Sequence, residues 1–133
     1  MTDHTPVMFA NEAFYLAFAA RDLDAMIEVW SRRETVTCIH PGAITLLGRD
    51  KVIQSWQAIL SNPASPAIVC RNPTAHLFGD VAYVLCWEQI EQAFLLATNI
   101  FVREDGRWRM VHHQATAAPA PGDLPPAPSQ PIH

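Results

Sequence analysis

Two polar residues in otherwise apolar surroundings are candidates for proton chemistry. His40 directly precedes Pro41 at the end of a segment rich in β-branched residues. An imidazole has an ordinary pKa of about 6.5, so it can move a proton near neutral pH. Asn99 lies in the apolar segment 93–103 and can donate a hydrogen bond through its amide. The structural alternatives are a hydrogen bond at a strand end for His40 and satisfaction of a buried backbone group for Asn99.

Glu88 follows Trp87 within the apolar segment 80–91. Burial of a carboxylate is costly unless the group is paired or protonated. One interpretation of Glu88 is an acid or base in a pocket. The alternative is an ion pair across a sheet with one of three arginines, namely Arg71, Arg103 or Arg109.

The adjacent His112 and His113 cannot both point into one cavity from a regular strand, because neighbouring side chains alternate between its faces. Regular alternation groups His113 with Val111, and His112 with Met110. A single bulge would exchange these faces. By the same alternation Asn99 shares a face with Ala97 and Phe101.

The elements that hold these residues begin with helices. Apolar periodicity predicts helices over 7–20, 22–31 and 50–60. In the first, Phe9 and Leu16 lie near one face with Ala13 and Ala20. In the last, Trp56 is either part of the core or a wall of a pocket.

Strands are expected over six segments, of which the last four are long: 34–40, 43–47, 67–78, 80–91, 93–103 and 107–116. Pro73 implies that its strand is an edge strand or carries a bulge. Helices followed by a run of antiparallel strands indicate the α+β class. A curved sheet wrapped around the helices leaves a hollow in which a pocket can form.

Composition limits the classes of function. Of the 133 residues, 50% are hydrophobic and 17% charged, which is typical of a folded domain. The net charge of −4 argues against an extensive basic face, so we expect no nucleic-acid partner. Nothing in the sequence reaches the length of about 20 apolar residues that a membrane span needs. We expect no membrane partner, no cofactor and no metal.

The number of cysteines and the composition of the C-terminal segment bear on the cellular compartment and on the extent of the folded domain. Three cysteines, Cys38, Cys70 and Cys86, do not form the even set of a disulfide framework, and no secretion signal begins the chain. We therefore expect free thiols and a cytoplasmic protein. Six of the fifteen residues from 119 to 133 are proline, which predicts a folded domain over 1–118 and an extended Pro-rich tail over 119–133.

The order of elements and several local strings resemble the SnoaL-like domains of the nuclear-transport-factor-2-like superfamily. The strings are Asp22-Leu23-Asp24, Cys38-Ile39-His40-Pro41-Gly42, Gly48-Arg49, Ala97-Thr98-Asn99-Ile100-Phe101 and Asp105-Gly106-Arg107-Trp108-Arg109-Met110-Val111-His112-His113. The chain is also similar to the association domain of calcium/calmodulin-dependent kinase II, at Asn72-Pro73, His76-Leu77, Gly79-Asp80, Trp108 and Val111-His112.

The resemblance implies a cone-shaped curved antiparallel sheet around three helices, a pocket at one end, and a homodimer through the outer sheet face. It also implies that the His113 face lines the pocket. The candidate catalytic residues are then His40, Asn99 and His113, and the candidate ligand-binding residues are Trp56, Glu88, Phe101 and Val111. His40 stands where ketosteroid isomerases carry an aspartate base, and Phe14 about where they carry a tyrosine, with Tyr15 beside it.

Two functions remain open at this point. The first is a SnoaL-like domain that binds a small apolar molecule with polar groups, with His40 as proton carrier if it is a small lyase, isomerase or cyclase. The second is a non-catalytic homo-oligomerisation domain with a vestigial pocket, in which Trp87, Trp108 and the strand at 81–91 form the subunit contact.

Overall fold

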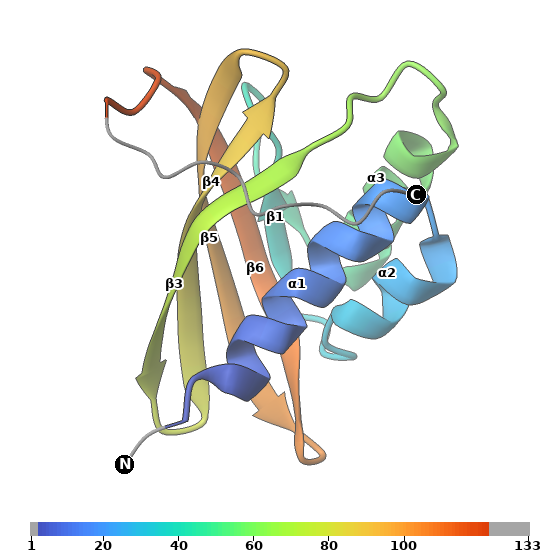
Figure 1. Cartoon of the computed structure of the whole chain (residues 1–133). Helices are drawn as coiled ribbons and strands as arrows, with labels where there is room; N and C mark the ends of the chain where they lie inside the picture. Colours follow the sequence, from blue (N-terminus) through green and yellow to red (C-terminus); the bar gives the residue numbers. More distant parts are fainter. Residues whose placement is uncertain (1–2, 123–133) are drawn as a thin grey trace.

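The computed structural model describes residues 3–122, which form helices on one side and a curved sheet on the other (Figure 1). The helices are α1 (Thr5–Ala20), α2 (Leu23–Val29) and α3 (Arg49–Ser61). The strands are β1 (Thr37–Ile39), β2 (Leu46–Leu47), β3 (Val69–Phe78), β4 (Val81–Ile90), β5 (Ala93–Glu104) and β6 (Arg107–Ala118). Each element falls on a segment for which the sequence predicted it.

The strands form a six-stranded sheet in the order β2-β1-β6-β5-β4-β3. The four long strands pair antiparallel through short turns, as the α+β prediction requires. The pairing of β1 with β6 is parallel, so the sheet is mixed. This pair can be parallel because the two strands are joined by a long connection that includes α3 and β3–β5.

Pro73 lies at an irregularity of the edge strand β3, where the register with β4 shifts between Arg71 and Thr74. Proline lacks the N–H that a regular ladder requires, so an edge position and a bulge both suit it. The neighbouring Asn72 has a positive φ of 53°, a conformation that asparagine tolerates better than most residues. The sequence expectation for Pro73 is therefore met in both respects.

A second bulge, in β6, determines which side chains face the helices. Ile100 pairs with His112 and Phe101 pairs with Met110, which leaves Val111 without an opposite residue. Met110 and His113 are consequently both buried. Regular alternation had grouped Met110 with His112, and this grouping is wrong because the extra residue reverses the alternation.

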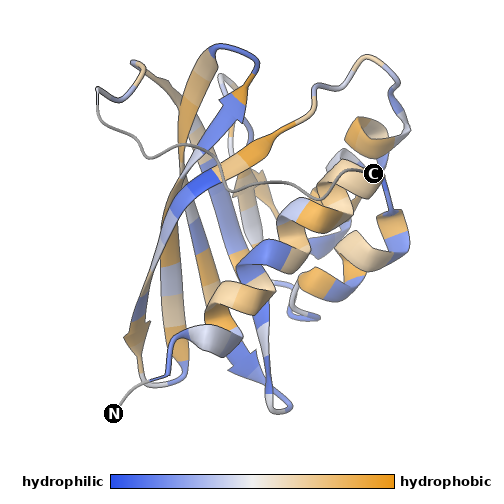
Figure 2. Ribbon diagram, viewed as in Figure 1, coloured by the Kyte–Doolittle hydropathy of each residue, from blue (hydrophilic) through white to orange (hydrophobic). Residues whose placement is uncertain are grey.

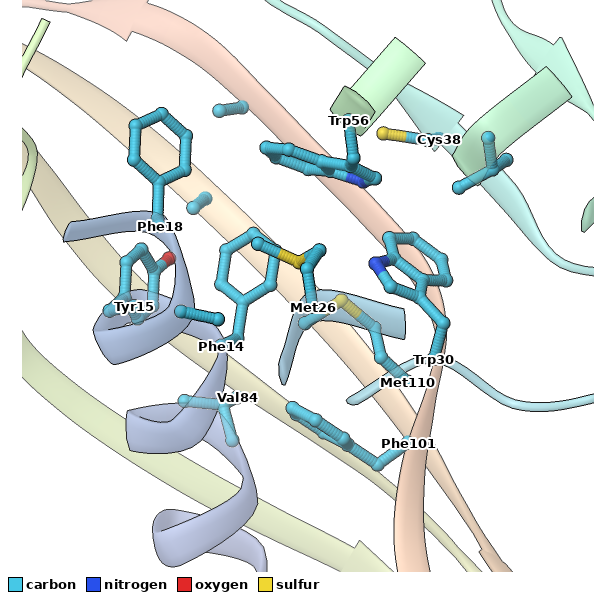
Figure 3. Packing of buried hydrophobic residues seen from close by; sticks show 14 of the residues in the cluster. Phe14, Tyr15, Phe18, Met26, Trp30, Cys38, Trp56, Val84, Phe101 and Met110 are labelled. Atoms are coloured by element: carbon cyan, nitrogen blue, oxygen red, sulfur yellow. The ribbon is translucent and has the colours of Figure 1, made fainter. Parts of the chain in front are cut away.

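The core fills the space between the helices and the inner face of the sheet (Figure 3). Bands of hydrophobic and hydrophilic residues alternate along the strands, as expected for a sheet with one covered face (Figure 2). Helix α1 contributes Val7, Asn11, Phe14, Tyr15, Ala17 and Phe18 to the buried side. The predicted apolar face of this helix is wrong, since Phe9 is 72% exposed and Leu16 is 61% exposed. The sequence of α1 has apolar residues on several sides of the helix, so the periodicity of these residues does not identify which side is buried.

Strand β6 ends at Ala118, the last residue of the predicted domain. Most of the predicted Pro-rich tail, 123–133, lies outside the described residues, so its extended conformation stays a prediction. Within residues 3–122, no helix has the length and apolar character that crossing a membrane requires.

Candidate acid–base cavity

A cavity of about 190 Å³ lies between the helices and the ends of the long strands. Three of the predicted site residues that line it have titratable side chains. Its walls are mostly apolar or aromatic, and its titratable side chains are His40, Glu88 and His113. The aromatic walls are Phe14, Phe18 and Trp56. Apolar cavities of about 150 Å³ hold a benzene ring, so the space suits a molecule of that size or slightly larger.

Glu88 is buried in the cavity wall, with 2% of its surface exposed. The Tyr15 hydroxyl donates a hydrogen bond to its Oε2 at 2.6 Å. Burial disfavours the carboxylate and raises the pKa of Glu88 to about 7, although the hydrogen bond from Tyr15 acts in the opposite direction. Near neutral pH, Glu88 is therefore present in both its acid and its base form.

The arginine pairing considered for Glu88 is not the arrangement that surrounds its carboxyl group. Arg103 faces Asp80 at 3.9 Å, and Arg109 contacts Glu28 and Glu104 at 3.6 Å each. Arg71 donates a hydrogen bond to Gln89. The hydrogen-bond donor to Glu88 is instead Tyr15, from α1.

His113 lies beside Glu88, with its Nε2 atom 4.0 Å from Glu88 Oε2. Its other ring nitrogen, Nδ1, is 2.6 Å from Asn99 Oδ1. Burial, together with the nearby His40 and His112, lowers the pKa of His113 to about 3. The imidazole is therefore neutral at pH 7, and its free lone pair can accept a hydrogen bond.

His40 directly follows β1 and lines the cavity, and its side chain also contacts Ser55 of α3. Its Nε2 is 3.0 Å from Ser55 Oγ, and this hydroxyl donates to the backbone oxygen of Val52 at 2.7 Å. Ser55 therefore accepts from an N–H at Nε2, so His40 Nδ1 carries a lone pair. Burial lowers the pKa of His40, which favours the neutral ring.

Asn99 is fully buried and lies behind His113, outside the set of residues that line the cavity. Its Nδ2 group donates to Asn11 Oδ1 at 2.8 Å and to the Tyr15 hydroxyl at 3.1 Å. Both amide hydrogens are thus engaged within the protein. Asn99 therefore contacts the cavity indirectly, through the hydrogen bond between its Oδ1 atom and His113.

The remaining predicted residues divide between the cavity and the core. Trp56 lines the cavity and is also 1% exposed, so it is both a pocket wall and a core residue. Phe101 does not line the cavity; in Figure 3 it lies at the opposite end of the core from Trp56 and Phe18. Val111 does not line it either, because it is the extra residue of the bulge and therefore does not share the face of His113.

The sequence did not identify Asn11 and Tyr15 as site residues. They stand four residues apart and therefore lie on one face of α1. Together they are the polar side chains on the buried face of this helix, and each contacts Asn99. An asparagine and a tyrosine at this spacing in an apolar helix are the signal that could have located them.

A larger groove of about 550 Å³ lies between the start of α1, α2 and the turn between β5 and β6. It is lined by Asp3, Glu28 and Arg107 among mostly apolar residues, and it contains none of the predicted site residues. Across residues 3–122, no group of three or more His, Cys, Asp and Glu side chains is arranged to hold a metal ion. The titratable residues predicted for the site thus gather at the smaller cavity, which we name the acid–base cavity.

A mixed, curved sheet with helices on its concave side and a polar group of residues inside defines a cone of the nuclear-transport-factor-2-like type. The family model of the SnoaL-like domain matches residues 7–121, and the chain belongs to this family.

Known proteins with sequence or structural similarity include an association domain, a dehydratase and an F-box protein. A Thiobacillus denitrificans structure assigned to the calcium/calmodulin-dependent protein kinase type II association domains is 33% identical, with a TM-score of 0.75, over 83% of this chain and 93% of that chain. A Streptomyces avermitilis structure assigned as a dehydratase of the NTF2-like family is 27% identical, with a TM-score of 0.78, over 87% and 96% of the two chains. The F-box protein SKIP8 of Arabidopsis thaliana is 29% identical over 112 residues, which are 83% of this chain and 48% of that protein. The chain thus spans about half the length of this curated relative.

Proposed function

We propose that this SnoaL-like domain binds a small, largely apolar molecule in the cavity and moves a proton on it. The observation that carries the proposal is the approach of His113 Nε2 to Glu88 Oε2, at 4.0 Å, inside a chamber walled by aromatic rings. A buried carboxyl group and a buried imidazole are costly to a fold that uses them only for packing. Titratable groups whose pKa values burial has shifted are found preferentially at functional sites.

The two groups are suited to different tasks. The pKa of Glu88, near 7, lets this carboxyl group both take up and release a proton at neutral pH, whereas the lone pair of His113 Nε2 accepts a hydrogen bond that orients the bound molecule. For a β-hydroxy ketone, the carboxylate form of Glu88 would take the proton next to the carbonyl and then give it to the departing hydroxyl, which His113 Nε2 holds in place. The products are an enone and water, and Glu88 returns to its carboxylate form. His40, at the cavity wall, is the alternative base.

This reaction class is a lyase-type elimination, and the same carboxyl group could also return the proton to a different carbon, as in an isomerase. The name of the Streptomyces relative supports the elimination, since that protein is assigned as a dehydratase. In this scheme Glu88 acts first as the base and then as the acid.

The experiment uses 3-hydroxycyclohexanone, a molecule small enough for the cavity, and follows formation of the enone by its ultraviolet absorption. We expect turnover by the wild-type chain and a loss of about 100-fold in Glu88→Gln, because general acid–base catalysis contributes a factor of this order. Glu91→Gln is the matched control, since Glu91 lies exposed in the turn between β4 and β5. Equal rates in the wild type and in Glu88→Gln, or no bound molecule at all, would contradict the proposal.

A second candidate function is homo-oligomerisation through the outer face of the sheet. Large apolar side chains are exposed there, with Phe78 at 65%, Leu85 at 41% and Leu96 at 44%. Exposed apolar patches of this kind mark interaction surfaces. The Thiobacillus relative, assigned as an association domain, supports this candidate. The two functions use opposite faces of the sheet and are compatible in one molecule.

Of the two tryptophans predicted for the subunit contact, Trp87 lies on the outer face near Leu85 and contacts Phe94 edge to face at 6.2 Å. Trp108 lies elsewhere, in the wall of the larger groove, with the Arg103 guanidinium 4.8 Å from its ring centre. The proposed contact surface is therefore formed by Phe78, Val81, Leu85, Trp87 and Leu96, which we name the outer apolar patch.

A further inference from the structure

We infer that Asn99 fixes which nitrogen of His113 carries the proton, and that the cavity consequently selects neutral molecules that donate a hydrogen bond, such as alcohols and phenols. The part of this inference that concerns ligands rests on the proposed function. The part that concerns the tautomer of His113 does not, because it follows from contacts inside the protein.

The orientation of the Asn99 amide is set from α1. Asn11 Nδ2 donates to the Cys70 thiol at 3.8 Å, which turns Asn11 Oδ1 towards Asn99. Asn99 Nδ2 then donates to this oxygen at 2.8 Å and to the Tyr15 hydroxyl at 3.1 Å. With its nitrogen engaged twice, the amide can present only its Oδ1 atom to His113.

An amide oxygen only accepts hydrogen bonds, so the short contact of 2.6 Å between Asn99 Oδ1 and His113 Nδ1 requires a proton on Nδ1. In the neutral ring the second nitrogen, Nε2, then has a lone pair and no proton. This bare acceptor is the atom that faces Glu88 at 4.0 Å. The hydrogen bonds from Asn11 to Asn99 and from Asn99 to His113 therefore select one of the two neutral tautomers of the imidazole, in which Nε2 is a hydrogen-bond acceptor.

The polar groups around the cavity are consequently rich in acceptors. His113 Nε2 carries a lone pair and Glu88 adds a carboxyl group, while the lone pair of His40 Nδ1 lies 3.9 Å from the Cys38 thiol. Ser65 directs its hydroxyl proton to the backbone oxygen of Ile59, at 2.7 Å. Among the described residues that line the cavity, none is lysine or arginine.

An anion would therefore meet the carboxyl group of Glu88 and the bare nitrogen of His113 without a compensating positive charge. A molecule with an O–H group fits better, because one oxygen can donate to His113 Nε2 and also accept from the acid form of Glu88. Two atoms 4.0 Å apart leave room for an oxygen about 2.8 Å from each, which is an ordinary hydrogen-bond length. The aromatic walls favour a ring behind this hydroxyl.

The first arm of the test needs no ligand. The ¹⁵N spectrum of imidazole-labelled full-length protein reports which nitrogen of His113 is protonated, and we expect Nδ1. Asn99→Asp retains the acceptor oxygen and should retain this tautomer, whereas Asn99→Leu should change the tautomer ratio by about fivefold, the ratio that corresponds to one hydrogen bond of about 1 kcal/mol. A proton on Nε2 in the wild type would overturn the inference whether or not either variant folds.

The second arm compares phenol, toluene and benzoate, which share one ring. We expect phenol to bind the wild type several-fold more tightly than toluene, to shift the His113 Nε2 signal, and to outcompete benzoate. Equal affinities for phenol and toluene, or tighter binding of benzoate, would overturn the selectivity while leaving the binding function intact. If none of the three binds, the proposed function fails for molecules of this size, and the selectivity fails with it.

Discussion

His113 Nε2 and Glu88 Oε2 lie 4.0 Å apart although they come from strands that are not neighbours in the sheet. Strand β5 separates β4 from β6, and its Asn99 holds His113 by a hydrogen bond of 2.6 Å. On the other side, Tyr15 holds Glu88 by a hydrogen bond of 2.6 Å. Each member of the pair thus has its own support, Asn99 for His113 and Tyr15 for Glu88.

Glu88→Gln should stabilise the protein above neutral pH. The pKa of Glu88 is raised from 4.5 to about 7 in the folded chain, so the folded state binds the proton more tightly than the unfolded state. The resulting stabilisation is complete below pH 4.5 and is lost as the pH rises to 7. We expect the wild type to lose about 3 kcal/mol relative to Glu88→Gln between these pH values.

Urea unfolding of both proteins at a series of pH values measures this difference. Glu91→Gln should show no comparable pH dependence relative to the wild type, because this side chain is exposed. A constant difference between the wild type and Glu88→Gln from pH 4 to pH 8 would show that Glu88 titrates normally.

Tyr15→Phe should destabilise the fold and raise the pKa of Glu88 above 7. The substitution removes the hydroxyl that donates to Glu88 and accepts from Asn99, so one buried amide hydrogen loses its partner. We expect a loss of about 1–3 kcal/mol in the free energy of unfolding. The carboxyl signal of Glu88 in a ¹³C titration measures the pKa directly.

The matched control for this substitution is Tyr83→Phe. Tyr83 lies on the outer face, where it stacks on His76 with ring centres 4.7 Å apart, and the substitution keeps this ring. A pKa of Glu88 that stays unchanged in Tyr15→Phe would mean that the hydroxyl does not bind the carboxylate in solution.

Phe101→Ala and Phe18→Ala should separate packing from ligand binding. Both remove a buried ring, and the expected cost for each is about 3–5 kcal/mol. Phe18 lines the cavity, so its removal should change the affinity for phenol and admit larger rings. Phe101 lies in the core away from the cavity, so its removal should leave the affinity for phenol unchanged as long as the protein folds. Equal effects of the two substitutions on phenol binding would place the ligand elsewhere.

Leu85→Glu should weaken or abolish self-association if the outer apolar patch is a subunit interface. A charge at the centre of such a contact is desolvated without a partner, which is unfavourable. Light scattering after size-exclusion chromatography measures the molar mass in each case. The control is Leu16→Glu, because Leu16 is more exposed than Leu85 but lies on α1. A monomeric wild type, or an oligomer that survives Leu85→Glu, would contradict assembly through this patch.

Much of the fold could be predicted from the sequence because its strands are marked by turns and by alternation. The turn at Asp105-Gly106 and the irregularity at Pro73 have local chemical causes that the residues themselves reveal. The bulge at Val111 carries no such mark, since strand β6 contains neither glycine nor proline. It depends on how β5 and β6 fit together, which is a tertiary property.

The site was predictable to a similar degree. His40, Glu88 and His113 could be selected because a titratable group in an apolar strand is unusual. Their supports could not, because Asn11 and Tyr15 lie in a helix that is apolar on several sides, and only the packed sheet decides which side is buried. For the same reason, the sequence suggested Asn99 as a ligand donor, whereas its two amide hydrogens are used inside the protein.

The most direct test of the account is a crystal structure of the wild-type protein soaked in phenol. The account predicts a ring in the cavity, packed against the aromatic wall that includes Phe18 and Trp56, with its hydroxyl oxygen within hydrogen-bond distance of both His113 Nε2 and Glu88. Phenol bound only outside this cavity, or a cavity that stays empty at saturating phenol, would contradict it.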